Sequence, residues 1–376
     1  MLNDAGHPDP LTASALPLFE AFPCLAQSVP WTPIGHWPTP VTDARHFAEQ
    51  HGLKALYVKR EDLSHPQCAG NKIRGLEFIL ADAGRRQAET LLTFGVVGSH
   101  HICRTAWHAR QHQIDTIAVV IDQPPAEYVT RNLAAVLASG TTLIPANRAT
   151  LLPKLAAQFA RAWIRHRRRP YVVPPGGTSP LSCLGHVNAA LELKRQIEAG
   201  QLAEPDYLYV ALGSLGTAAG LLTGCKLAGL KTRLVGIVAS YRWYCTAARW
   251  ARLARRIHRL MRRLDPAVPA LSIERPELSV VTTALGDGHA RPTAESLRLS
   301  ESFRTAENLE LDGTYTAKAL HGALQFIEGL GAHDSVHLFW HTCHSMPKPA
   351  ANDVSPSALP PVLRHYLQSD TYMTLR

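Results

Sequence analysis

The stretch YLYVALGSLGTAAG, residues 207–220, passes from an apolar run through a glycine-rich turn into a helix-forming segment. Its first part, Tyr207 to Leu212, is short and apolar, as in a buried parallel strand. The small residues from Gly213 to Thr217 let backbone N–H groups close around an anion at a helix N-terminus. The turn therefore binds a phosphate group or simply packs closely. The dinucleotide version is disfavoured, because the spacing is G-x-x-G and no acidic residue follows at the expected distance.

The same alternation of strand and helix extends from about residue 55 to 240. Apolar, β-branched runs predict strands at 56–59, 90–94, 116–121, 142–144, 171–173, 207–212, 233–238 and, later, 337–341. Helical patterns predict helices at 73–85, 105–112, 128–138, 151–166, 183–199 and 218–228. This repetition indicates an α/β fold with mostly parallel sheets covered by helices on both faces. In such folds ligands lie beyond the carboxyl ends of the strands.

Composition and charge describe a folded globular chain. The 376 residues are 46% hydrophobic and 18% charged, which is too apolar for disorder. The net charge of +9 lies mainly in two runs, 165–169 and 249–263. The second run has apolar residues at helical spacing, so we interpret it as the solvated face of an amphipathic helix. An anionic partner or membrane surface remains the alternative for this helix, and no nucleic-acid partner is expected.

Compartment and redox state follow from what the sequence lacks. Seven cysteines occur without a C-x-x-C pair, which fits neither a zinc ribbon nor a disulfide framework. The first thirty residues carry acidic residues and prolines rather than a basic start and an apolar core, so they do not resemble a signal peptide. No run of eighteen apolar residues indicates a transmembrane helix. We therefore expect a cytoplasmic protein without a membrane partner.

A lysine lies directly after a glycine turn in the segment AGNKIR, residues 69–74. At the start of the predicted helix, the positive helix end disfavours protonation of the Lys72 amine, which suits formation of a Schiff base. Taken alone, a solvated lysine at an ordinary helix start is the simpler interpretation. Other motifs end predicted strands or turns: KRED at 59–62, TFGVVGSHH at 93–101, GGTSPL at 176–181, DGTYTAKA at 312–319 and FWHTCH at 339–344.

Together and in this order, the motifs resemble one family, the pyridoxal-5'-phosphate (PLP) dependent 1-aminocyclopropane-1-carboxylate deaminases and D-cysteine desulfhydrases. The resemblance runs from about residue 38 to 347. The family's KRED and GNKxRxLE motifs look like 59–62 and 70–77, and its phosphate loop looks like 213–217. Its GGSNPLGxLGYxxAxxEL motif looks like 176–193, and its YxGKA motif looks like 315–319 with a departure at Ala317.

The resemblance implies a tryptophan synthase β-like fold of type II, in which PLP lies in a cleft between two domains. The large domain would comprise residues 1–74 and 184–376, and a small α/β domain, residues 75–183, would be inserted between them. The resemblance also implies a homodimer.

The site residues follow from the same motifs. Lys72 would hold PLP covalently, and the cofactor would also contact Asn71, His100, Gly213, Ser214, Leu215, Gly216, Thr217, Thr316 and Thr342. Candidate catalytic residues are Lys72, Tyr315, Ser99 and His289. The substrate would contact Ser99, His100 and His101.

Histidines and a cysteine at 100, 101, 289, 337, 341, 343 and 344 match no compact zinc motif, so we expect no metal.

Several departures from the family alter the walls that face the substrate. His100 replaces the asparagine of QSNH, which bonds the cofactor phenol oxygen in the family, and His289 replaces the tyrosine of YGxP. The family's HTGG becomes HTCH at 341–344. Histidine still donates a hydrogen bond, but it titrates near neutral pH, so we expect a pH dependence between about 5 and 8.

The position after Tyr315 discriminates between activities. The deaminases carry a glutamate there, near the pyridine nitrogen, whereas this chain has Thr316. A neutral group suits α,β-elimination, because a long-lived quinonoid is not required. We expect a PLP-dependent lyase that acts on a small amino acid like D-cysteine desulfhydrase, giving an oxo acid and ammonia. The alternatives are a 1-aminocyclopropane-1-carboxylate deaminase and a PLP-binding homologue without turnover.

Overall fold

The larger of two sheets combines strands from residues 41–60 with strands from residues 207–341. The computed structural model describes residues 16–275, 278–342, 357 and 359–367. The larger sheet has the order β1 (Val41–Asp43), β2 (Ala55–Arg60), β10 (Val336–His341), β7 (Tyr207–Leu212), β8 (Arg233–Val238), β9 (Ser279–Val281). β1 is antiparallel to β2, and all the other neighbours are parallel.

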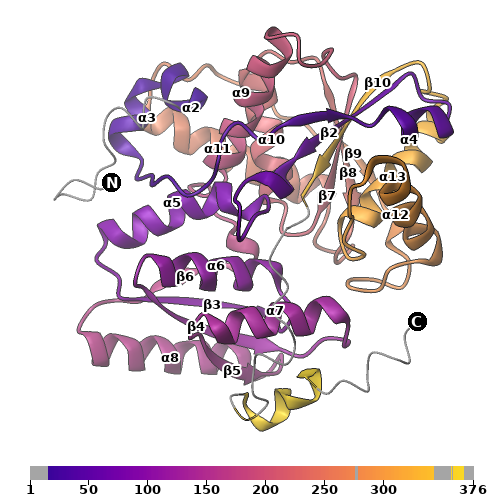
Figure 1. Ribbon diagram of the computed structural model, residues 1–376. Helices are drawn as coiled ribbons and strands as arrows, with labels where there is room; N and C mark the ends of the chain where they lie inside the picture. The colour runs from indigo at the N-terminus through magenta and orange to yellow at the C-terminus, as the bar shows by residue number, and fades with distance from the viewer. Residues whose placement is uncertain (1–15, 276–277, 343–356, 358, 368–376) are drawn as a thin grey trace.

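The smaller sheet comes from one continuous part of the sequence. Its order is β5 (Thr142–Ala146), β4 (Asp115–Ile121), β3 (Thr90–Val96), β6 (Tyr171–Val173), with every pair parallel. Figure 1 shows the larger sheet in the upper half of the molecule and the smaller one below it. The two-sheet α/β fold confirms the predicted fold class, whereas the domain boundaries at 74/75 and 183/184 stay a prediction.

Helices cover both faces of the larger sheet because successive strand residues point to opposite sides. In β10, Leu338 and Trp340 join one apolar cluster and Phe339 joins the other. The first cluster packs α2 (Pro17–Ala21), α3 (Pro23–Ser28), α9 (Leu184–Glu198), α10 (Gly216–Leu227) and α11 (Ala247–Leu264). The second packs α4 (Arg45–Gln50), α12 (Ala294–Glu307) and α13 (Thr316–Leu330).

The smaller sheet is covered in the same way. α5 (Lys72–Arg85), α6 (His100–Gln111) and α7 (Glu127–Ala138) pack on one side, and α8 (Leu151–His166) lies on the other (Figure 1). A short helix near the C-terminus, η6 (Pro361–Leu367), adds Leu363 and Tyr366 to the cluster under α7. The Tyr366 backbone carbonyl and hydroxyl both bond to this unit, so the last described segment is attached to the smaller sheet.

All the strands and helices predicted between residues 55 and 240 are present. The largest difference is α6, which begins at His100 rather than 105, because the Ser99 hydroxyl caps it by accepting from Ile102 N at 3.4 Å. The predicted amphipathic helix is α11, whose apolar face is buried while its arginines are exposed. Sequence patterns did not predict α2, α3, α4, β1, β9, α12 or α13.

A buried ion-pair network connects β2, α5 and α9. Arg74 donates to Glu61 Oε2 at 2.7 Å and to Glu192 Oε2 at 3.0 Å, and Lys59 Nζ donates to Glu192 Oε1 at 2.5 Å. Burial alone would raise the pKa of Glu192, but Arg74 and Lys59 lower it to about 2. Glu192 is therefore ionised, and removing one member would leave a buried charge without its partner.

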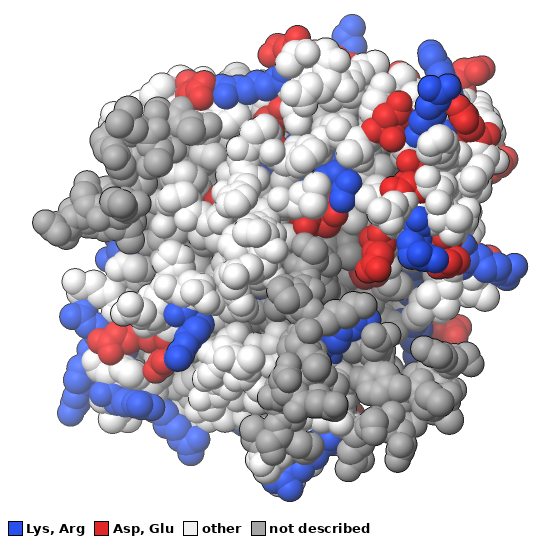
Figure 2. All heavy atoms as spheres, viewed as in Figure 1, with Lys and Arg blue, Asp and Glu red and all other residues white. Residues whose placement is uncertain are grey.

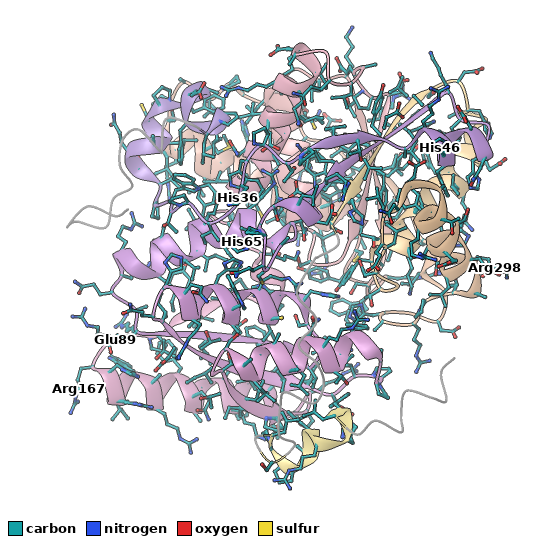
Figure 3. All side chains as sticks on the ribbon, in the orientation of Figure 1. His36, His46, His65, Glu89, Arg167 and Arg298 are labelled. Carbon is teal, nitrogen blue, oxygen red and sulfur yellow. The ribbon has the colours of Figure 1, made fainter. Side chains whose placement is uncertain are left out.

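The basic runs lie on solvated faces. In the run 165–169, His166 Nδ1 lies 2.8 Å from Glu89 and Arg168 Nε lies 3.4 Å from it; Figure 3 labels Glu89 and Arg167 at this end of α8. On the face in Figure 2, basic side chains are interleaved with acidic ones. Within the described ranges, no helix has the length and apolar character needed to span a bilayer.

Candidate active site

Strands of both sheets end at a shared cavity of about 560 Å³. Phe94 and Ile121 reach it from the ends of β3 and β4, and Gly213, Ser240 and Thr342 follow the ends of β7, β8 and β10. This is the location predicted for a ligand in a parallel α/β fold. The cavity lining includes the candidates Asn71, Lys72, Ser99, His100, His101, Gly213, Ser214, Leu215, Gly216, Thr217, His289, Tyr315 and Thr342.

Lys72 is the first residue of α5 and follows a turn that only glycine adopts readily, since Gly70 has φ +125°. Burial lowers the pKa of its amine to about 8, opposed by Cys183 and assisted by the positive charge of Arg104. The structure records no hydrogen bond between this amine and another described residue. About a tenth of the amine is therefore neutral and nucleophilic at pH 7, far more than for an ordinary lysine.

The glycine-rich turn forms a closely packed cradle at the start of α10. Leu215 adopts the left-handed conformation with φ +69°, which directs the chain into the helix. Thr178 Oγ1 donates to Ser214 Oγ at 2.7 Å, and Asn71 Nδ2 donates to Thr217 Oγ1 at 2.7 Å. A Cβ on Gly216 would lie 2.9 Å from Thr178 Oγ1. The turn thus presents two hydroxyls and the free N–H groups of a helix N-terminus to the cavity.

His100 is held as a neutral hydrogen-bond donor. Asn132 Nδ2 donates to Gly98 O at 2.8 Å, and the same amide nitrogen lies 3.2 Å from His100 Nδ1. Since the amide is the donor, Nδ1 must accept, and the ring proton lies on Nε2. Burial, together with Arg104, lowers the pKa of His100 to about 3. The expected titration between pH 5 and 8 is therefore wrong for His100, because its burial was not visible in the sequence.

His101 borders the cavity, but its ring nitrogens lie beside hydroxyls from β3 and α6, in the same part of the molecule as the smaller sheet. Nδ1 lies 3.3 Å from Thr105 Oγ1, and Nε2 lies 3.5 Å from Thr93 Oγ1. Burial lowers its pKa to about 3.

Tyr315 and His289 lie side by side in the cavity wall, with ring centroids 5.7 Å apart. Burial and the charge of Asp312 raise the pKa of Tyr315, so its hydroxyl keeps its proton. Burial lowers the pKa of His289, and its Nδ1 lies 3.4 Å from Ala239 O. Both side chains are therefore neutral near pH 7.

Thr316 differs from the other candidates because it is buried behind the cavity wall. Its hydroxyl accepts from Asp312 N at 2.7 Å and donates to Asp312 Oδ2 at 2.7 Å. Asp312 itself lines the cavity, but its Oδ1 accepts from Tyr315 N at 2.7 Å. Both carboxylate oxygens are thus occupied within the loop. The role expected of Thr316 beside a pyridine nitrogen stays a prediction.

Arg104 is a cavity residue that the motifs did not reveal. It is 1% exposed, its Nη1 donates to His100 O at 3.2 Å and its Nε donates to Ala69 O at 3.3 Å. Its Nη2 is buried with no hydrogen-bond partner in the described part of the chain. The i, i+4 spacing from His100 places both residues on one face of α6, but this signal was hidden because the helix was predicted to begin at 105.

Tyr128 and three aromatic residues after β8 were also missed. The Tyr128 ring stacks on His100 at 5.4 Å, and its hydroxyl bonds to the Thr314 side chain, which belongs to the other sheet's unit. Tyr241, Trp243 and Tyr244 line the cavity from the loop that follows β8. Their place just beyond a strand's carboxyl end was a usable signal.

The remaining histidines have structural partners. His341 lies 3.0 Å from Asp62 Oδ1, and His337 lies 3.0 Å from the Tyr209 hydroxyl. Cys343 and His344 lie outside the described residues. In the part of the chain that the structure describes, no three His, Cys, Asp or Glu side chains are arranged to hold a metal ion.

Comparison with known proteins shows the class of enzyme to which this chain belongs. The family model described as "Pyridoxal-phosphate dependent enzyme" matches residues 33–341, and the chain belongs to that family. Among its relatives, the D-cysteine desulfhydrase of Serratia proteamaculans is 30% identical over 315 residues, 81% of this chain and 90% of that protein. The nocardicin C-9' epimerase of Nocardia uniformis subsp. tsuyamanensis is 31% identical over 294 residues, 77% and 86% of the two chains.

Solved structures of related proteins have the same fold as this chain. A homologue of 1-aminocyclopropane-1-carboxylate deaminase is 30% identical with a TM-score of 0.73, covering 86% of this chain and 94% of its own. Threonine deaminase isoform 2 from Solanum lycopersicum, 15% identical with a TM-score of 0.59 over 92% of this chain and 93% of its own, shares the fold. The family and the cofactor expected from the motifs are confirmed.

Proposed function

We propose that this PLP-dependent enzyme is a lyase that eliminates a β-substituent from an amino acid, as the name of the Serratia relative implies for D-cysteine. The observation that carries the proposal is the buried Lys72 amine, whose pKa is lowered to about 8, in one cavity with the glycine-rich turn. An amine that is partly neutral near pH 7 forms a Schiff base and accepts a proton from carbon.

The residues present fit the cofactor. A phosphate group would be held by the N–H groups at the start of α10 and by the hydroxyls of Ser214 and Thr217, in a cradle that a Cβ on Gly216 would fill. Lys72 would form the covalent link, and His100 would donate from Nε2 to the phenol oxygen. The neutral tautomer fixed by Asn132 supports this role.

The chain's own side chains have distinct tasks. Bound PLP withdraws electrons from Cα of the substrate and so eases loss of the α proton. Lys72, once released, accepts that proton, and the Tyr315 hydroxyl, which stays protonated, donates one. The substrate carboxylate would lie at the N-terminus of α6, beside Ser99 and the buried guanidinium of Arg104. Tyr128, stacked on His100 and bonded to Thr314, limits the access of water.

The test is an amino-acid panel on the PLP-loaded protein. D-cysteine, β-chloro-D-alanine, their L forms and 1-aminocyclopropane-1-carboxylate are compared, with pyruvate or 2-oxobutanoate as the readout. We expect pyruvate from a β-substituted substrate at the highest kcat/KM. A higher value for 2-oxobutanoate from the cyclopropane substrate would favour the deaminase alternative. Retention of PLP without release of an oxo acid from any substrate would identify a binding homologue.

Three further features belong to the proposal. The homodimer is supported by the family resemblance and the domain boundaries by the separation of strands into two sheets, while the cytoplasmic location is supported by the cysteine pattern of the sequence. Light scattering on the purified protein tests the dimer, cell fractionation tests the location, and limited proteolysis tests the boundaries.

A further inference from the structure

We propose that the substrate carries an aromatic group on the atom that leaves Cβ, and that a series of rings from Tyr315 to Trp243 holds this group. The inference rests on the proposed function, since it takes elimination at Cβ as the reaction. It adds the chemical class of the leaving group, an aromatic thiol such as phenylmethanethiol.

The rings form a continuous series along the cavity wall. Centroids are 6.0 Å apart between His100 and Tyr315 and 5.7 Å apart between Tyr315 and His289. The series continues from His289 to Tyr241 at 5.7 Å and from Tyr241 to Trp243 at 6.1 Å. All five residues line the cavity. At these spacings neighbouring rings are in contact, so together they form one aromatic wall against which a further ring can pack from the cavity side.

The series ends at the mouth of the cavity. Trp243 is 68% exposed and Tyr241 is 42% exposed, although both rings are large and apolar. The Arg249 guanidinium lies 5.6 Å from the Trp243 ring and 5.0 Å from the Tyr244 ring, which orders this edge of the loop. Exposed aromatic residues that continue a buried site indicate a surface for binding an apolar group.

Charge in this region disfavours the other side-chain classes. Asp312 is the only acidic residue among the described lining residues. Hydrogen bonds from Tyr315 N and the Thr316 hydroxyl hold its carboxylate at the Tyr315 end of the series, away from Trp243. Burial lowers the pKa of His289, and the raised pKa of Tyr315 keeps its hydroxyl protonated, so neither ring carries a charge near pH 7. The Arg249 guanidinium already lies over the Trp243 and Tyr244 rings, so an acidic group at the mouth would have to draw this cation away from them. An uncharged, flat group therefore fits this wall best.

Water is the only reactant that the elimination needs besides the amino acid. The α proton passes to Lys72 and the Cβ–S bond breaks, so that sulfur keeps the electron pair and takes a proton, and a double bond forms between Cα and Cβ. Cβ then takes a proton to become the methyl group, and water replaces nitrogen at Cα. S-benzylcysteine plus water thus gives phenylmethanethiol, pyruvate and ammonium, and the thiol leaves through the mouth beside Trp243.

The first test compares kcat/KM of the PLP-loaded protein for S-benzylcysteine, S-methylcysteine and cysteine, each in D and L form, by pyruvate release. We expect kcat/KM for S-benzylcysteine to exceed that for S-methylcysteine by about tenfold or more, because stacking on aromatic residues contributes binding free energy of this size. Trp243→Ala should lower this ratio mainly by raising KM for the benzyl substrate. Trp163→Ala, which removes a half-exposed tryptophan from α8, should leave the ratio unchanged. Equal values for benzyl and methyl substrates, or an unchanged ratio in Trp243→Ala, would overturn the proposal.

The second test needs no turnover. N-phosphopyridoxyl conjugates of S-benzylcysteine and of alanine, made by reduction, are titrated into cofactor-free protein by calorimetry. We expect the benzyl conjugate to bind about tenfold more tightly, and Trp243→Ala to remove that difference. If the benzyl preference is seen while the panel gives no oxo acid, the ring series is supported and the lyase proposal fails. If both conjugates bind equally, the ring series is wrong while the cofactor site stands. If neither binds, both proposals are overturned.

Discussion

Lys72 and Arg104 place two basic side chains in one buried space, and each has a different task. Lys72 sits at a helix start where burial lowers its pKa to about 8, whereas Arg104 stays a cation with a free Nη2. The first is suited to covalent chemistry and the second to binding an anion. Sequence motifs identified Lys72 but not Arg104, because Arg104 lies outside every motif that carried the resemblance.

Lys72→Arg should abolish the visible absorbance of the bound cofactor while leaving the fold intact. The guanidinium keeps the positive charge but does not form a stable Schiff base, since it is not deprotonated in proteins. The measurement is the absorption spectrum after dialysis against PLP, with circular dichroism as the check on folding. Lys194→Arg, on the exposed side of α9, is the control. An unchanged visible spectrum in Lys72→Arg would rule out this lysine.

Asn132→Asp tests the tautomer of His100. The introduced carboxylate would accept a proton from Nδ1 and would raise the pKa of His100 from about 3 towards its usual range. We expect the visible spectrum of the bound cofactor to become pH-dependent between about 5 and 8, whereas the wild-type spectrum stays constant there.

Asn132→Leu serves as the comparison, because it removes the donor without adding a charge. It should weaken cofactor binding but leave the spectrum independent of pH. If Asn132→Asp and the wild type respond alike to pH, Asn132 does not position His100.

Among the helices and strands, the start of α10 contributes most to the proposed phosphate site. The strand, the glycine turn and the helix were all predicted from the pattern in 207–220, and they are β7 and α10. The pattern left phosphate binding and close packing as alternatives. The structure adds two donors from distant parts of the sequence, the Thr178 hydroxyl and the Asn71 side-chain amide, which bond to the hydroxyls of the turn.

Gly216→Val should weaken PLP retention much more than it lowers the melting temperature of the cofactor-free protein. The new Cβ would meet Thr178 Oγ1 at 2.9 Å and would occupy the space where phosphate oxygens approach. The comparison is Gly329→Val, since a Cβ at this position in α13 meets nothing within 4 Å. Cofactor affinity is measured by titration of the apo protein. Equal affinities for Gly216→Val and wild type would leave only the packing role.

Elements outside the regular alternation were harder to predict. β1 and β9 are three residues long and α4 is six, so their sequences contain too few periods to give a pattern. α6 was predicted to begin at 105, because the polar histidines at its start interrupt the apolar pattern. In the structure, the Ser99 cap sets the first residue of the helix. Local side-chain bonds, rather than hydrophobic periodicity, decide such boundaries.

Across the whole molecule, residues of the family motifs stabilise the fold as well as line the site. Lys59 and Glu61 of the KRED stretch, with Arg74 and Glu192, form the buried network. Glu77 accepts from Trp31 Nε1 at 3.0 Å and Trp37 Nε1 at 2.8 Å, which ties the N-terminal segment to α5. A shared motif therefore locates the site correctly, but only the structure separates residues that touch the cavity from those that support it.

Glu192→Gln should destabilise the protein by about 3 to 5 kcal/mol, because it leaves Lys59 and Arg74 buried beside a neutral group. The pKa of Glu192 is lowered from 4.5 to about 2 in the fold. Its stabilisation is complete above the unfolded pKa and is lost as pH falls from about 4.5 to 2. The difference in unfolding free energy between wild type and variant should therefore shrink over this interval.

The control is Glu198→Gln, on an exposed pair with Lys194, which should change stability by less than about 1 kcal/mol. Urea titrations at pH 7 and at pH 3 supply the comparison. A Glu192→Gln protein as stable as the control variant would contradict the assigned role of the network.

The basic pair Lys72 and Arg104 also has a consequence for how long the protein lasts in a cell. No ion pair to either residue occurs within the described ranges, so anionic PLP supplies charge that the cofactor-free fold lacks. A ligand that binds only the folded state lowers the unfolded fraction by mass action, and proteases remove the unfolded chain. We expect protein abundance to follow the supply of vitamin B6, with cells starved of the vitamin degrading this chain faster than fed cells.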